Sequence, residues 1–216
     1  MSDPESLNFS PRDISVDTID QFYFTVDQER KFDLLLKLLE REQPRQAIIF
    51  CRTKRGTERI YQRLAKRLQH TAGIHGDMQQ SARDRVMQAF REGQVQYLVA
   101  TDVVGRGIDV SGISHIINFD TPQFCDDYIH RVGRTGRMGR EGVAFTFVTP
   151  EEGNELTRIE QRINRLLKRD ELPGFEAVAL PAAPVHAMDQ TPDKTAPPPP
   201  PAAAQRRPPK RYRRAL

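Results

Sequence analysis

The arginine-rich stretch HRVGRTGRMGR, at residues 130–140, is the part of the chain best suited to chemistry on phosphate groups. An arginine stands at every third position from Arg131 to Arg140, and a glycine directly precedes three of them. A guanidinium group offers N–H donors in a planar fork that fits phosphate oxygens, and it can stabilise the charge that develops during phosphoryl transfer. The alternative is a flexible arginine–glycine segment that binds RNA. Patterned residues on both sides place the stretch inside the fold and favour rigidly held arginines.

A second candidate is the glycine-containing stretch ATDVVGRGIDV at residues 100–110. Glycines on both sides of Arg106, the first of them Gly105, allow a backbone to approach a bulky anion with its N–H groups as donors. Thr101 offers a hydroxyl suited to a phosphate oxygen, and Asp109 is an anion that suits the hydroxyl groups of a ribose. The alternative is an ordinary glycine turn with a capping aspartate.

Two further stretches have the same character. In HGDMQQSAR, at residues 75–83, Gln80 and Arg83 fall three positions apart at the start of an expected helix, so they share one face near its positive end. That arrangement suits a phosphate backbone, although Asp77 could simply cap the helix and Arg83 could lie in water. In FCRTKRG, at residues 50–56, basic residues follow an apolar run; the alternative is a set of solvated charges at a helix start.

These stretches need elements to position them, and short apolar runs alternate with amphipathic helical patterns along the chain. The expected strands cover residues 18–26, 46–51, 71–75, 95–101, 115–120 and 142–149. The expected helices cover residues 28–42, 55–70, 79–93, 124–132 and 150–169. This alternation predicts an α/β domain on a mostly parallel sheet. In such folds the ligand lies at the carboxyl ends of the strands, so we expect the functional loops to be those that follow AIIFC, AGIH, YLVAT and IINFD.

Composition sets the limits of the domain. The chain has 216 residues, a net charge of +4 and 38% hydrophobic residues, and most of its 16 prolines follow Leu172. Cys51 and Cys125 lack the spacing of metal ligands, so we expect core thiols, no metal site and a reducing cytoplasm. No signal peptide or transmembrane run is visible, which argues against a membrane partner. Residues 205–216 contain six basic residues and no acid, and we expect them to add weak, salt-sensitive affinity for RNA; the alternative is a solvated linker that keeps the protein soluble.

Taken in order, five stretches resemble the successive motifs of the C-terminal RecA-like domain of DEAD-box RNA helicases. They are AIIFCRTK, HGDMQQSARDRVMQAFREG, ATDVVGRGIDV, IINFDTP and YIHRVGRTGRMGR. The last motif is the most specific, because related helicases usually begin it with glutamine rather than with the His-Arg pair present here. The resemblance implies a three-layer RecA-like domain at residues 18–170, with a mostly parallel sheet flanked by helices. A lead-in at residues 1–17 would precede it. The lack of periodicity and the run of five prolines predict a disordered, proline-rich basic tail at residues 171–216.

The resemblance also implies roles for the site residues. Arg134 and Arg137 would be arginine fingers that reach the γ-phosphate of ATP, and Asp109 would contact its ribose. His130 and Arg131 would couple the nucleotide cleft to the partner domain and to RNA. The RNA-backbone path and the junction between the two halves would be formed by Arg52, Thr53, Gly76, Arg83, Thr101, Gly105 and Arg106. Where Gly105 stands the family most often has alanine, so the turn is looser here.

The sequence contains neither a GxxxxGK[ST] phosphate loop nor a DEAD tetrad. We therefore expect a fragment or a truncated gene product: the C-terminal half of an ATP-dependent RNA helicase, an enzyme within the full protein and inactive alone. ATP with Mg would be held mainly by an N-terminal RecA-like domain in cis. The other expected partner is RNA, bound through its backbone with low sequence specificity, and the fragment is expected to be a monomer. A stand-alone RNA-binding or regulatory module and a DNA helicase motor remain as alternatives.

Overall fold

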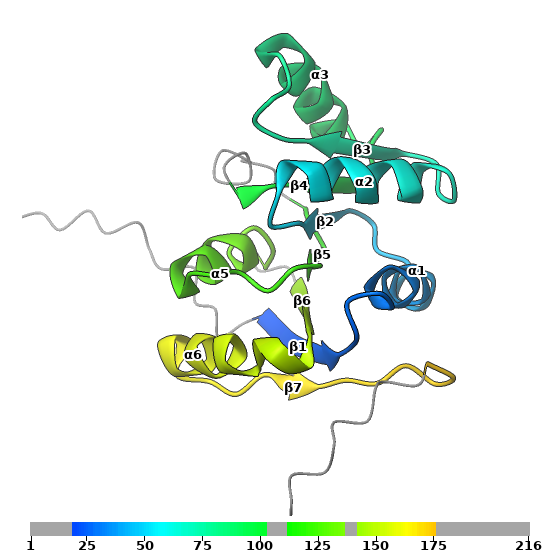
Figure 1. Ribbon diagram of the computed structural model, residues 1–216. Coiled ribbons are helices and arrows are strands. Elements are labelled where there is room, and N and C mark those ends of the chain that lie inside the picture. The colour runs from blue at the N-terminus through cyan, green and yellow to red at the C-terminus, as the bar shows by residue number, and fades with distance from the viewer. Residues whose placement is uncertain (1–18, 103–111, 137–141, 176–216) are drawn as a thin grey trace, which may run out of the picture. The chain divides into compact units, whose positions relative to one another are not determined.

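The computed structural model describes residues 19–102, 112–136 and 142–175, which form a seven-stranded sheet (Figure 1). Its order is β3-β4-β2-β5-β6-β1-β7, and every neighbouring pair is parallel. The strands are β1 Ile19–Thr25, β2 Ala47–Phe50, β3 Thr71–Ile74, β4 Tyr97–Ala100, β5 His115–Asn118, β6 Gly142–Val148 and β7 Lys168–Arg169. The helices are α1 Lys31–Glu42, α2 Lys54–Ala65, α3 Gln80–Arg91, α5 Cys125–Val132 and α6 Gly153–Ile163, with a 3₁₀ turn at Pro150–Glu152.

Helices cover both faces of the sheet, so the domain has three layers (Figure 1). The central strands are apolar at consecutive positions because both faces are buried. In β2, Ile49 packs with side chains of α1 and α2, whereas Ile48 packs with those of α3, α5 and α6. The expected α/β architecture and the six expected strands are confirmed.

The closing helix is shorter than the sequence analysis expects. A helix was expected to run to Arg169, but α6 ends at Ile163, and Asn164 adopts a left-handed conformation with φ 52°. Asparagine tolerates this conformation better than most residues, so it acts as a helix stop. The chain then turns back and Leu167 is buried, after which β7 pairs with β1. The helical prediction for residues 164–169 is therefore wrong.

The end of the described chain packs against α1. Leu172 is buried, the Arg30 guanidinium lies 4.6 Å from the centre of the Phe175 ring, and Lys37 Nζ donates to the Gly174 carbonyl at 3.0 Å. Ordered packing thus extends to Phe175, into the first residues that the sequence analysis assigns to the tail. The lead-in at residues 1–17 and the tail from residue 176 lie outside the described residues. No helix in the described part is long and apolar enough to cross a membrane.

Candidate functional site

The carboxyl ends of the strands meet at one edge of the sheet, because all the strands run in parallel. Phe50 and Ile74, the last residues of β2 and β3, both pair with Ala100, the last residue of β4. The residues that follow these three neighbouring strands therefore lie next to each other. Four of the predicted RNA-contact residues are among them: Arg52, Thr53, Gly76 and Thr101.

The loops after β2 and β3 are tied together. Thr53 caps α2, with its Oγ1 accepting from the Gly56 backbone N–H at 3.0 Å. The next residue, Lys54, forms an ion pair with Asp77 in the loop after β3. The hydrogen bond from Lys54 lowers the pKa of the Asp77 carboxyl. Asp77 therefore links the loops rather than capping α3. Gly76 lies beneath this pair, since a Cβ there would lie 3.4 Å from Lys54 Cε.

The start of α3 has the expected geometry. Arg83 Nη1 donates to Gln80 Oε1 at 3.0 Å, so the two side chains share one helix face. Three polar atoms near this edge are buried and have no hydrogen-bond partner within the described part of the chain: His75 Nδ1, Arg83 Nε and Thr101 Oγ1. Unsatisfied buried polar groups cost free energy, and each one calls for an explanation such as a ligand.

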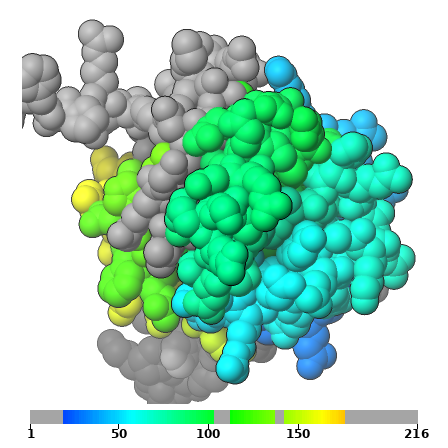
Figure 2. Space-filling model, turned by 90° about the horizontal axis from the view of Figure 1, so that it is seen from above, coloured from blue at the N-terminus to red at the C-terminus, as the bar shows by residue number. Residues whose placement is uncertain are grey.

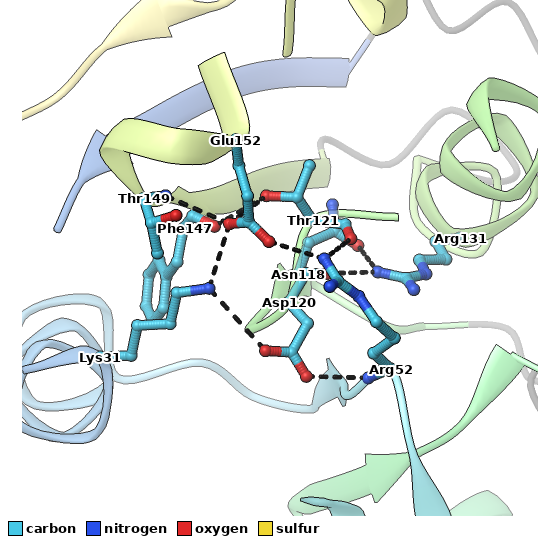
Figure 3. Close-up of polar contacts among 9 residues, drawn as sticks. All are labelled: Lys31, Arg52, Asn118, Asp120, Thr121, Arg131, Phe147, Thr149 and Glu152. Carbon is cyan, nitrogen blue, oxygen red and sulfur yellow. Dashed lines mark hydrogen bonds and ion pairs between the residues drawn. The ribbon is translucent and has the colours of Figure 1, made fainter. Parts of the chain in front are cut away.

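Arg131 is buried, with 2% of its side chain exposed. Figure 3 shows its side chain pointing toward Asn118, the last residue of β5. Its Nε and Nη2 donate to the two Asp102 carboxylate oxygens at 2.5 and 2.8 Å. Its Nη1 donates to Asn118 Oδ1 at 3.1 Å and to the Asp120 carbonyl at 2.9 Å. The bidentate pair between Arg131 and Asp102 therefore fixes Asp102, the residue directly before segment 103–111.

A second polar cluster joins α1 to the ends of β5 and β6 (Figure 3). Glu152 lies at its centre and accepts from Lys31 Nζ at 3.3 Å, Arg52 Nη2 at 2.6 Å and Thr121 Oγ1 at 3.1 Å. Asp120 lies 3.8 Å from the same Lys31 ammonium and accepts from the Arg52 backbone N–H at 2.8 Å. The Lys31 side chain is fully buried. The cluster therefore holds the Arg52 guanidinium in a fixed orientation.

Lys31 and Glu152 are not among the site residues predicted from the sequence. Burial by itself would raise the pKa of the Glu152 carboxyl, but the Lys31 ammonium and the hydrogen bonds from Thr149 and Thr121 bring it below its ordinary value. Glu152 belongs to a capping box with Thr149, and this motif is visible in the sequence as Thr-Pro-Glu-Glu. This capping box was the one feature of the sequence that could have pointed to Glu152.

The predicted finger region follows α5. His130 is exposed, and its carbonyl accepts from Arg134 Nε at 3.1 Å. The turn is anchored by Thr135, whose Oγ1 donates to the Ile113 carbonyl at 2.6 Å. Arg134 is half-buried, and its hydrogen bond to the His130 carbonyl ties its guanidinium to the backbone of the last turn of α5. The remaining predicted residues of the site lie outside the described residues: Gly105, Arg106, Asp109 and Arg137.

Comparison with known proteins decides the family. The helicase conserved C-terminal domain family matches residues 30–139. The DEAD-box ATP-dependent RNA helicase CshA of Bacillus cereus is 42% identical over 176 residues, which cover 82% of this chain and 34% of that protein. This chain belongs to the helicase C-terminal domain family, in its DEAD-box form. CshA of Geobacillus kaustophilus is 44% identical over 176 residues, which cover 82% of this chain and 38% of that protein. The chain thus spans about a third of the length of these curated relatives.

Solved structures agree with this DEAD-box assignment. E. coli SrmB, crystallised with the regulator of ribonuclease activity A, has a TM-score of 0.68 and 34% identity, covering 72% of this chain and 92% of that one. S. cerevisiae Dbp5 bound to RNA and ADP BeF3 has a TM-score of 0.68 and 36% identity, covering 71% and 42%. The RecA-like fold and the family resemblance are confirmed. Among the described residues, no group of three or more potential ligands could hold a metal ion.

Proposed function

We propose that this DEAD-box domain is the C-terminal half of an ATP-dependent RNA helicase and grips RNA by its phosphate backbone. The unsatisfied atoms of Thr101 and Arg83 carry the proposal, because Thr101 directly follows β4 and Arg83 lies in the first turn of α3, the helix that follows β3. Each buried unsatisfied group costs about 1–3 kcal/mol, which a phosphate oxygen would recover after a small local adjustment. Phosphate contacts position a nucleic acid without reading its bases, so low sequence specificity is expected.

The proposed RNA-contact set keeps the residues predicted from the sequence. They are Arg52, Thr53, Gly76, Arg83 and Thr101, with Gly105 and Arg106 from segment 103–111. Arg52 fits this role because its Nη2 is occupied by Glu152 and by the Thr121 carbonyl, which fixes the plane of the guanidinium. The Dbp5 relative, whose structure contains RNA, supports the same reading.

On the nucleotide side, Arg134 and Arg137 are proposed as arginine fingers and Asp109 as the ribose contact. Hydrolysis of ATP with Mg would drive the cycle of RNA binding and release, and an N-terminal RecA-like domain in cis would hold most of the nucleotide. Arg134 fits because the bond to the His130 carbonyl limits the directions that its guanidinium can take. The residue Arg131 is proposed to act indirectly. Its four hydrogen bonds position Asp102 and hence the start of the segment that carries Asp109.

Steady-state ATPase assays of the full-length protein test the nucleotide side. Arg134→Ala and Arg137→Ala should each lower the RNA-stimulated kcat by roughly 10³- to 10⁵-fold, the usual value of an arginine finger, with little change in RNA affinity. Arg158→Ala, at an exposed position of α6, is the matched control and should leave kcat unchanged. The monomeric 216-residue chain should have no measurable ATPase activity. Turnover by the isolated chain that survives both finger substitutions would contradict the proposal.

RNA titrations test the backbone contacts. Thr101→Val keeps the shape of the side chain and removes the hydroxyl, so we expect a higher RNA concentration for half-maximal ATPase and an unchanged saturated kcat. Affinity should fall steeply with salt for every RNA sequence tested. Deletion of residues 205–216 should weaken binding at low salt. Equal stimulation of the ATPase by DNA would refute the choice of RNA.

A further inference from the structure

Helix α2 presents a row of basic side chains on the face opposite the core. Thr57, Ile60 and Leu64 are its buried residues. Arg55, Arg59 and Lys66 recur at helical spacing on the opposite side and are exposed. Arg63, on the flank of the helix beside Phe32, and Arg67, one residue after the C-cap Lys66, add two further exposed charges, and we call these five residues the α2 basic face.

The charge of the α2 basic face is not neutralised within the fold. Glu58 is the one acidic residue in α2, and it accepts from Gln62 at 2.6 Å and lies 3.6 Å from His75 Nε2. Arg63 stacks on the Phe32 ring, with its guanidinium carbon 3.7 Å from the ring centre. The other four residues of the face form no ion pair with any acidic side chain of the described chain. By contrast, Arg162 of α6 pairs with an aspartate at 3.1 Å.

The α2 basic face begins at the proposed RNA site. Thr53 caps the helix at the carboxyl edge of the sheet, and Lys54 joins it to the loop after β3. From there α2 extends for 12 residues, which is about 18 Å of helix. Figure 2 shows α2, in cyan, beside α3, in green, on one surface of the molecule. A nucleic acid that leaves the strand ends can therefore continue along α2.

We propose that the α2 basic face binds the duplex part of the RNA substrate, next to the single-strand path at the strand ends. This inference rests on the proposed RNA-dependent function. Duplex RNA is recognised through phosphates and shape, so its binding surface needs charges along an extended path and no exposed aromatic ring for base stacking. The α2 basic face offers charges and no such ring, because Tyr61 packs against Gly73, where a Cβ would lie 2.9 Å from the ring. A membrane-surface helix would need an accessible apolar face, and that of α2 is buried in the core.

The test compares two triple variants of the full-length protein. Arg55→Gln/Arg59→Gln/Lys66→Gln removes three charges from the α2 basic face. The matched control, Arg45→Gln/Arg91→Gln/Arg158→Gln, removes three exposed charges elsewhere. Fluorescence anisotropy gives the Kd of each protein for a single-stranded RNA and for the same strand extended by a hairpin duplex, across a series of salt concentrations.

The α2 variant should bind the duplex-bearing RNA at least 10-fold more weakly than the wild type, with its salt slope reduced by up to about 3, roughly 0.9 for each lost phosphate contact. Its Kd for the single strand and its ATPase stimulated by single-stranded RNA should change less than 2-fold. An unchanged duplex Kd, an equal loss for the single strand, or an equal loss in the control would each overturn the assignment. A wild-type protein whose ATPase does not respond to RNA would instead refute the proposed function.

Discussion

Substitution of Arg131 by methionine tests whether the buried fork is a structural requirement of the domain. Methionine is close to arginine in length and fills the same space, so the change removes charge and hydrogen bonds with little loss of volume. Arg131 donates twice to Asp102, once to Asn118 and once to the Asp120 carbonyl. The substitution leaves all three acceptors without their donor.

The loss in the free energy of unfolding depends on how exposed these acceptors are to water. Removing one partner of a buried ion pair typically costs about 3–5 kcal/mol. The Asp102 side chain is 26% exposed, so water recovers part of its loss, whereas Asn118 is fully buried. We therefore expect Arg131→Met to lower the free energy of unfolding by about 3–4 kcal/mol, within the range that follows from breaking a buried pair. Against a typical total of about 5–15 kcal/mol, this leaves a folded but weakened domain.

Urea unfolding followed by circular dichroism measures this free energy, and a double-mutant cycle assigns it. Asp102→Asn should cost less, about 1–2 kcal/mol, because the amide keeps one acceptor oxygen. The double variant should cost clearly less than the sum of the two, with a coupling of about 1–3 kcal/mol. Arg131→Lys is the control for charge without the fork and should give an intermediate loss. A loss below about 1 kcal/mol for Arg131→Met, or a coupling near zero, would refute the structural reading.

Three other expectations follow from the described packing. Folding lowers the pKa of the Glu152 carboxyl, so its contribution to the free energy of unfolding is complete above the unfolded pKa of about 4.3 and is lost as the pH falls through the folded pKa. The difference in the free energy of unfolding between wild type and Glu152→Gln should therefore disappear below the folded pKa. A difference that persists at that pH would contradict the assignment. Gly142→Ala places a Cβ 2.5 Å from the Gly136 backbone nitrogen and should destabilise the domain by about 1–3 kcal/mol, whereas Gly153→Ala, with open space around it, should not. Equal urea midpoints for the two variants would contradict the close packing of this turn. Burial raises the pKa of the Cys51 thiol, so a thiol reagent should modify the half-exposed Cys125 first, with one fast equivalent by mass spectrometry and not two.

Much of the fold was predictable because the sheet is parallel and buried on both faces. Runs such as AIIF in β2 and YLVA in β4 are apolar at every position, and their length distinguishes strands from helices. The end of α6 was not predictable from periodicity. Leu166 and Leu167 continue the helical pattern, but Asn164 ends the helix and only Leu167 is buried.

Part of the site was also predictable from the sequence, and part of it was not. Arg52, Gly76 and Thr101 lie at one edge of the sheet, as expected from the sequence, because each comes within two residues of the end of a strand whose direction the fold class fixes. The Lys31 cluster was missed because a lysine within an amphipathic helix is normally solvated. Its burial depends on the meeting of Glu152 and Asp120 from two other strand ends, and local sequence patterns do not record that contact.

The position of β1 in the sheet has a consequence for synthesis and folding. Its sheet partners are β6 and β7, which come last among the described strands, and Ile19 pairs with Gly142. During translation, β1 is therefore made roughly 10 s before β6 at ordinary rates of elongation. For that interval the aromatic strand IDQFYFT has no partner and is a binding site for chaperones or for another nascent chain. A chain that ends between β1 and β6 would keep this segment unpaired, so we expect truncated products of the domain to aggregate.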